Sequence, residues 1–304
     1  MRNQQPRISI IIPARNEGAR VVSAIRSFAH GRSHTFPLEF VIVDDASDDN
    51  CCAGLKNIFD TNRDLVTVKV LRLNVWSGIP LARNRGAFEA TAPVLAITDA
   101  NVVASPGWDI PVFRDLRPHR ALCGIIADMA SQWKGIGCTL EIPSMGTKWL
   151  SASEPYNGFI PIMPEAATVI PTELFRQLGG YDTAMPVYGA CEPEFSLRLW
   201  LSGAEIVAAP GIVYSHRFRP ERERAPFLKQ IETVLIQNYL RFGLLYLNSR
   251  EIVELFSHYA SNTSPTHFQH ALEAVGTGDV WQRREHLRQN LKYDFAWFRR
   301  RFGI

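Results

Sequence analysis

The feature that most constrains this chain is the alternation of apolar runs and helical patterns over its first hundred residues. Four runs rich in β-branched and aliphatic residues predict buried strands, and the segments between them have apolar residues at helical spacing. Strands joined through helices by short connections form βαβ units and a parallel sheet. The expected strands are 7–13, 38–43, 66–73 and 94–98, and the expected helices are 17–29, 51–59 and 81–90.

The alternation ends near residue 128, where Gly, Pro and aromatic residues become scattered. Helical patterns return at 172–178 and 192–201, and Gly203 is the expected C-cap of the second. From about Pro226 onward, three or four helical stretches are expected. The charged stretch between Arg219 and Pro226 divides the chain into a unit of residues 1–225 and a helical extension of residues 226–304.

Composition excludes several classes of protein. With 46% hydrophobic residues and a net charge of +3 over 304 residues, the chain is neither a disordered tail, a collagen-like chain nor a coiled-coil rod. The near-neutral charge argues against nucleic acid as a partner. The five cysteines are odd in number and lack CxxC spacing, so a reducing compartment fits best. The N-terminal apolar run is too short for a signal peptide or a membrane span, so a soluble, cytoplasmic protein is expected.

Polar residues follow three of the expected strands, where parallel sheets bind their ligands. Asp44 and Asp45 could accept hydrogen bonds from a nucleobase or ribose, and a turn or helix cap is an equally open interpretation. Asp99 and Asn101 carry oxygen atoms two residues apart in a turn, where they could converge on a cation that neutralises a diphosphate. For this pair by itself, a plain turn is the preferred interpretation.

A family resemblance is carried by the segments IIPARNEG, VIVDDASDD and ARNRGAFEATAPVLAITDAN. They resemble the nucleotide-binding half of family-2-type glycosyltransferases. The later segment GGYDTAMPVYGACEPEFSLRLWLSGAEIVAAPGIVYSHRFR looks especially like the catalytic domain of polypeptide N-acetylgalactosaminyltransferases. The resemblance spans about residues 7–219. It implies an α/β protein of the GT-A fold, a Rossmann-like mixed sheet flanked by helices, in residues 1–225, followed by the helical extension 226–304.

The resemblance implies an enzyme that transfers a sugar from a nucleotide-sugar donor, in the first place a UDP-sugar, to a hydroxyl-bearing acceptor. The acceptor could be a glycan, a peptide, a lipid-linked molecule or a small molecule. One alternative is a degenerate, non-catalytic protein that binds a nucleotide sugar, to which Asn101 and Cys191 point. Another is a sugar-phosphate nucleotidyltransferase, whose Gly-rich loop with Arg and Lys is absent from PARNEG.

The resemblance also assigns residues to the donor. Asp44 or Asp45 matches the acid that contacts uracil or ribose, and Arg83 matches a basic residue near the nucleotide. The implied nucleotide-binding set is Pro13, Ala14, Arg15, Glu17, Asp44, Asp45, Arg83, Asp99 and Ala100.

Asp99, Asn101 and His216 match the metal ligands of the family. A histidine ligand favours Mn²⁺ over Mg²⁺. The family usually has Asp or His where this chain has Asn101, so metal independence stays open.

Glu192 matches the general base of inverting members, which takes the proton of the acceptor hydroxyl. The polypeptide transferases, which retain configuration, have Glu and Asn where this chain has Cys191 and Glu192. The carboxylate at the base position favours inversion. A helix N-terminal acid is the alternative for Glu192, and for Glu194 pairing with Arg198 at i+4 is preferred.

The donor sugar or acceptor side is assigned to Tyr181, Asp182, Trp133, Trp149 and Arg219. The aromatic residues could pack on sugar or peptide, and Arg219 lies in a stretch that could close as a lid over the diphosphate. The alternatives are core packing for the aromatic residues, a turn for Tyr181 and Asp182, and a solvated charge run for the stretch that contains Arg219. Residues 281–304 are amphipathic and basic, which suits peripheral membrane contact or, in the preferred interpretation, packing on the catalytic domain or a homodimer interface.

Overall fold

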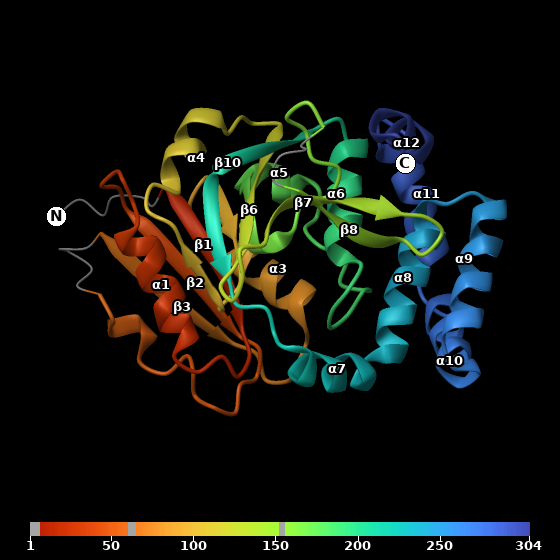
Figure 1. Cartoon of the computed structure of the whole chain (residues 1–304), viewed down its shortest axis with the longest axis horizontal. Coiled ribbons are helices and arrows are strands. Elements are labelled where there is room, and N and C mark those ends of the chain that lie inside the picture. Colours follow the sequence, from red (N-terminus) through yellow and green to blue (C-terminus); the bar gives the residue numbers. More distant parts are fainter. Residues whose placement is uncertain (1–6, 60–64, 152–155) are drawn as a thin grey trace.

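The structure is a computed structural model, and it describes residues 7–59, 65–151 and 156–304. Its centre is a ten-stranded mixed sheet with the order β3-β2-β1-β4-β9-β6-β10-β5, and β7 and β8 branch from β6. Helices cover the sheet, and the C-terminal helices gather at the end of the molecule opposite β1–β3 (Figure 1). The α/β GT-A fold expected from the sequence is confirmed.

The N-terminal half of the sheet is parallel, as the alternating pattern predicts. It consists of β1 (Ile8–Ala14), β2 (Leu38–Asp44), β3 (Val66–Arg72) and β4 (Val94–Ile97). Every residue of β2 is buried, and β1 is buried at every position but Pro13, as in a sheet covered on both faces. The crossover helices α1 (Arg20–His30) and α3 (Ile79–Glu89) bring the carboxyl ends of β1, β2 and β4 to one edge.

The rest of the sheet is mixed. Strand β9 (Thr168–Pro171) runs antiparallel to β4 and to β6 (Arg120–Asp128), and β10 (Glu205–His216) runs parallel to β6. Strand β5 (Val102–Ala104) closes this edge antiparallel to β10, and β7 (Lys134–Glu141) and β8 (Gly146–Ser151) form a hairpin. Two short helices complete this half, α4 (Asp109–Asp115) and α5 (Thr172–Gln177).

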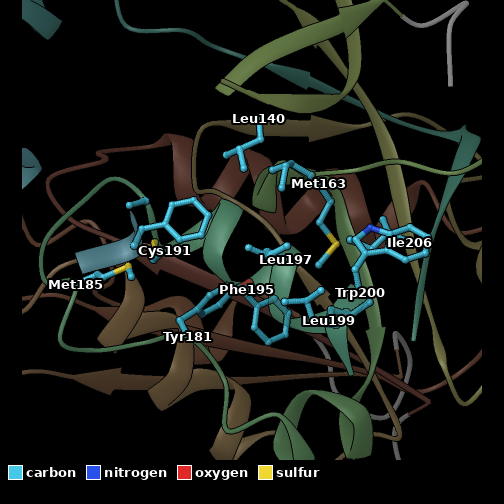
Figure 2. Close-up of a cluster of buried hydrophobic side chains, with 14 of the residues drawn as sticks. Leu140, Met163, Tyr181, Met185, Cys191, Phe195, Leu197, Leu199, Trp200 and Ile206 are labelled. Atoms are coloured by element: carbon cyan, nitrogen blue, oxygen red, sulfur yellow. The ribbon is translucent and has the colours of Figure 1, made fainter. Parts of the chain in front are cut away.

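Helix α6 (Cys191–Leu201) passes through the core. Phe195, Leu199 and Trp200 are fully or almost fully buried, as their spacing predicts, and Figure 2 shows aliphatic, aromatic and sulfur-containing side chains around the helix. Gly203 follows the helix with φ +94°, and the amide of Ala204 bonds back to the carbonyl of Leu199. The glycine therefore allows the left-handed turn that ends the helix.

The C-terminal extension differs from its prediction in number. All of residues 226–304 are described, and they hold five complete helices rather than three or four, while α7 (Glu221–Gln230) runs across the proposed boundary at 225/226. These five are α8 (Glu232–Tyr246), α9 (Ser249–Asn262), α10 (Pro265–Gly276), α11 (Val280–Asn290) and α12 (Phe295–Phe302).

The amphipathic C-terminal segment turns its apolar side inward. Leu287, Phe295, Phe298 and Phe302 are buried in the same core cluster as α6, as packing on the catalytic unit requires. No helix among the described residues combines the length and apolar composition needed to cross a bilayer.

The expected helix at 51–59 is wrong. The structure has turns there and one 3₁₀ turn, η1 (Leu55–Asn57). Asn50 and Gly54 have φ of +55° and +73°, and two left-handed residues four apart interrupt a helix. The burial of Cys51 and Leu55 at i and i+4 imitates the helical pattern.

Candidate active site

Arg83 connects two carboxylates that are far apart in the sequence. It projects from α3, and its Nη2 lies 2.6 Å from Oδ1 of Asp99, which follows β4. Its Nη1 lies 3.3 Å from Oε1 of Glu192, in the first turn of α6. The arginine side chain is 1% exposed, whereas Asp99 and Glu192 are 26% and 37% exposed. A buried cation thus holds two acids at a solvent-accessible surface.

The three groups change one another's ionisation. Burial alone would raise the pKa of Asp99, but Arg83 and His216 together hold it well below its usual value. Burial raises the pKa of Glu192, and the negative charge of Asp99 adds to this, while Arg83 and His216 oppose it. The two acids are therefore separated in proton affinity: Asp99 stays ionised, and Glu192 is the better proton acceptor.

The expected metal ligands lie together only in part. His216, at the end of β10, has its Nε2 3.5 Å from Oδ2 of Asp99, and its buried Nδ1 has no hydrogen-bond partner in the described structure. Asn101 instead donates its Nδ2 to the carbonyl of Arg217 at 2.9 Å. The described part of the chain has no group of three or more His, Cys, Asp and Glu side chains that could hold a metal. Asp99 and His216 are thus the two expected ligands that the structure brings together, and their oxygen and nitrogen atoms fit a divalent cation.

The two acids after β2 bind protein groups. Asp44 accepts the amide of Ser47 at 2.8 Å and pairs with Arg72. Asp45 accepts the amides of Ser77 and Gly78 at 2.7 and 2.8 Å, so it fixes the loop that starts α3. Asp44 and Asp45 are each only 4% exposed. In this structure both acids shape the strand-end loops.

Arg15, after β1, spans the two strand ends. Its Nη1 donates to the carbonyls of Asp45 and Ala46, both at 2.7 Å. Its guanidinium lies over the ring of Trp76, 5.0 Å from the centroid. The last two residues of β1 are Pro13 and Ala14, and Ala100 lies in the turn after β4. Because β1 lies between β2 and β4 in the sheet, these residues are close to the strand-end side chains.

Glu17 ties the first strand end to the segment after β10. It pairs with Arg20 at 2.8 Å and with Arg219 at 3.3 Å. The guanidinium of Arg219 also lies over Phe227 of α7. Arg219 therefore sits at the rim of the strand-end surface, in the segment expected to close over the donor.

Glu194 supports the site from inside. It forms a two-point contact with Arg198 at 2.9 and 2.7 Å, as the i+4 spacing predicts, and accepts a hydrogen bond from Tyr246 of α8 at 2.8 Å. Arg198 also donates to the carbonyls of Leu178 and Gly180. This network fixes the start of α6 to the extension, and Glu192 beside it remains partly exposed.

Tyr181 and Asp182 have structural surroundings. Tyr181 is 2% exposed and packs edge-on against Phe175. Asp182 is bound by Arg241 of α8 at 2.9 Å and by Arg283 of α11 at 3.1 Å. Tyr181 therefore packs between α5 and α6, and Asp182 connects this segment to the extension.

Trp133 and Trp149 are half-exposed on the β6–β7 loop and on β8. Their rings meet edge to face at 5.0 Å, and Trp133 contacts Phe218 at 5.6 Å. Phe218 lies 4.4 Å from the ring of His216. An aromatic row therefore leads from the hairpin to the Asp99–His216 pair.

Several members of the site are not foreseen in the sequence. Trp76 and Phe218 each follow the end of a strand, and this position could have identified them. No sequence pattern identifies Tyr246, Arg241 and Arg283, because they come from the extension and contact Glu194 or Asp182 across long separations, such as the 52 residues between Glu194 and Tyr246.

Comparisons with known proteins agree with this geometry. Residues 9–136 match the family model "Glycosyl transferase family 2". N-acetylgalactosaminyltransferase 6 of Drosophila melanogaster is 25% identical over 96% of this chain and 44% of its own length. Polypeptide N-acetylgalactosaminyltransferase 9 of Homo sapiens is 26% identical over 96% of this chain and 49% of its own. The chain thus spans about half the length of the curated relatives it matches.

Solved structures show the same fold. A structure of GalNAc-T7 with UDP, GalNAc and Mn²⁺ has a TM-score of 0.76 and 20% identity over 99% of this chain and 57% of that one. A mannosyltransferase from Pyrobaculum calidifontis with GDP-Man and Mn²⁺ has a TM-score of 0.56 and 19% identity, over 91% of this chain and 77% of that one. The resemblance predicted from the sequence is thereby confirmed: the chain has the GT-A fold and is related to family 2 glycosyltransferases and, over nearly its whole length, to the polypeptide N-acetylgalactosaminyltransferases.

Proposed function

We propose that the protein is a glycosyltransferase that moves a sugar from a nucleotide-sugar donor, a UDP-sugar, to a hydroxyl-bearing acceptor. The observation that carries this proposal is the Arg83 bridge, which holds the acid after β4 and the acid at the start of α6 on one surface. The UDP and GalNAc in the GalNAc-T7 structure support the donor class.

The donor diphosphate would lie at the strand ends, against Arg15, Arg83 and Asp99. Asp99, His216 and the amide oxygen of Asn101 would hold a divalent cation there, with Mn²⁺ favoured because of the histidine. Such a cation, when bound, supplies positive charge that neutralises the leaving diphosphate. Mn²⁺ in both of the compared structures supports this assignment.

Glu192 would act as the general base. The acceptor oxygen forms a bond to the anomeric carbon as its proton passes to the Glu192 carboxylate, and the bond from that carbon to the diphosphate oxygen breaks. The raised pKa of Glu192 makes it a stronger base than an exposed glutamate. A single displacement of this kind inverts the anomeric configuration. The row formed by Trp149, Trp133 and Phe218 would receive the acceptor, because flat apolar sugar faces and peptide side chains pack on exposed aromatic rings.

Calorimetric titration tests the proposal. UDP, with GDP as a control, is titrated into the protein in Mn²⁺ or EDTA, and again into Asp99→Ala and Asp128→Ala. Asp128 is the control because it is a half-exposed acid at the end of β6, opposite His216 in the sheet, and its carboxylate accepts hydrogen bonds from Ala130 and Ser131. UDP binding that needs Mn²⁺ and Asp99 but not Asp128 supports the donor and the cation site. Binding that EDTA leaves unchanged would make the site metal-independent, and absence of binding to either nucleotide would contradict the proposal.

A further inference from the structure

A cavity lies in the extension, at the far end of α6 from Glu192. Its volume is about 640 Å³, within the range of small-molecule sites. It is lined by Leu201 at the end of α6 and by residues from the end of α8 and from α9, α11 and α12. Leu201 is nine residues from Glu192, which in a helix corresponds to about 14 Å along the axis. The cavity is therefore separate from the donor site.

Positive charge dominates the lining. The lining contains five cationic and two acidic residues, so its net formal charge is +3. Both acids already have partners: Glu251 pairs with Arg299, and Asp294 accepts the amide of Trp297 as the N-cap of α12. The five cations are Arg284, Arg288, Lys292, Arg299 and Arg300.

Three of these cations, Arg288, Lys292 and Arg300, have no carboxylate partner in the described residues, and all three are exposed. Arg284 is held on the cavity wall by the carbonyls of Leu244 and Leu247. Burial and the positive charge of the neighbouring Arg288 lower the pKa of Arg284, so two like charges lie close together on this wall.

The remaining lining is apolar. Leu245, Leu287 and Leu291 contribute aliphatic surface, and Tyr293 and Trp297 stack at 4.1 Å with an interplanar angle of 7°. A free inorganic anion would leave this surface unused, and an uncharged hydrocarbon would leave the cations unpaired. The lining therefore matches a ligand with an anionic head and an apolar body.

We propose that this cavity binds a phosphate-bearing amphiphile, with the phosphate against Arg288, Lys292 and Arg300 and the apolar part against the leucines and Trp297. Phosphate is the favoured anion because several cations without a carboxylate partner among the described residues line one cavity, and a phosphate offers three oxygens to guanidinium and ammonium donors.

Calorimetry with three probes tests the proposal: farnesyl monophosphate, inorganic phosphate and farnesol. The variant Arg288→Gln/Lys292→Gln removes two cavity charges. The matched control Arg26→Gln/Lys56→Gln removes an exposed arginine and lysine on α1 and η1 that likewise lack a carboxylate partner. Circular dichroism checks that both variants are folded.

We expect farnesyl monophosphate to bind the wild type, with inorganic phosphate and farnesol at least about tenfold weaker, because each offers one half of the matched chemistry. The cavity variant should lose about tenfold or more in affinity, and the control should stay within about twofold. If farnesol bound as tightly as farnesyl monophosphate, the cavity would not recognise the phosphate. If inorganic phosphate bound as tightly, the apolar lining would not contribute to binding. Unchanged affinity in the cavity variant, or no binding to the wild type, would overturn the site.

Discussion

Nη2 of Arg83 lies 2.6 Å from Oδ1 of Asp99, and the guanidinium is nearly inaccessible to solvent whereas the carboxylate is not. Because Arg83 also reaches Glu192, one buried cation lowers the pKa of both acids. Its single positive charge is taken up by the protein's own carboxylates, so the positive charge that a diphosphate requires is left to the proposed divalent cation.

Arg83→Gln should weaken UDP binding in Mn²⁺ and lower kcat/KM by about a hundredfold or more, since two charge-assisted contacts are lost. It should also raise the pKa of Glu192 further, because the attraction of Arg83 is removed and the repulsion of Asp99 remains. Arg85→Gln is the matched control, an exposed arginine on the same helix that pairs with Glu89. Equal effects of the two variants on UDP affinity would show that the bridge has no role in binding.

Glu192→Gln should lower sugar transfer by about 10²–10⁴-fold, the usual contribution of a general base. The free energy of unfolding should stay equal or rise, because the ionised glutamate is held in an environment that disfavours its charge. Urea unfolding and a transfer assay measure the two effects, and Glu205→Gln, which changes a partly exposed acid at the start of β10, is the control. A variant that is active but less stable would assign Glu192 a structural role.

The pH dependence of transfer should follow the raised pKa of Glu192. A base acts only when ionised, so kcat/KM should fall as the pH drops through that pKa, at a pH above the ordinary value of 4.5. The sign for stability is opposite: a raised acid pKa means that ionisation costs folding energy, so protonating this group stabilises the fold as the pH falls. A pH–rate profile measures this fall of kcat/KM at low pH. If the same fall persisted in Glu192→Gln, it would belong to another group.

Glu194→Gln should lower the free energy of unfolding by about 3–5 kcal/mol, since it leaves Arg198 buried without its anion. Tyr246→Phe should cost about 1–2 kcal/mol, because one bond to the carboxylate is lost. The matched control is Glu254→Gln, which breaks an exposed i,i+4 glutamate–arginine pair and should cost less than about 0.5 kcal/mol. Urea unfolding compares all three, and a cost for Glu194→Gln as small as that of the control would contradict the network.

Trp133→Ala and Trp149→Ala should raise the KM for the acceptor several-fold, because stacking on an aromatic ring contributes about 0.5–1.5 kcal/mol. UDP affinity should not change, since neither ring contacts the strand ends. Trp281→Ala, in the extension and 54% exposed, controls for the loss of a surface tryptophan. A change in donor affinity without a change in acceptor KM would move these rings from the acceptor side to the donor side.

The sequence predicts best what depends on local pattern. Continuous apolar runs identify β1 and β2, and the buried face of α6 is readable from Phe195, Leu199 and Trp200. The role of Glu194 is also foreseen, because Arg198 is its neighbour on the helix. Asp182 is different: its charge is matched by Arg241 and Arg283, which approach only after the extension has folded back. Nothing in the local sequence distinguishes such an acid from a substrate contact.

Helices α6 and α7 are held in the fold in unequal ways. Every residue of α6 is buried except Glu192, so this helix cannot shift without opening the core. Helix α7 buries none of its residues and touches the site through Phe227, which meets Trp76 and Tyr188. Helix α6 is therefore held fixed by the core, whereas α7 can be displaced at small cost. In the proposed transferase, substrate entry and product exit would depend on the movable α7, while Glu192 on α6 keeps its position.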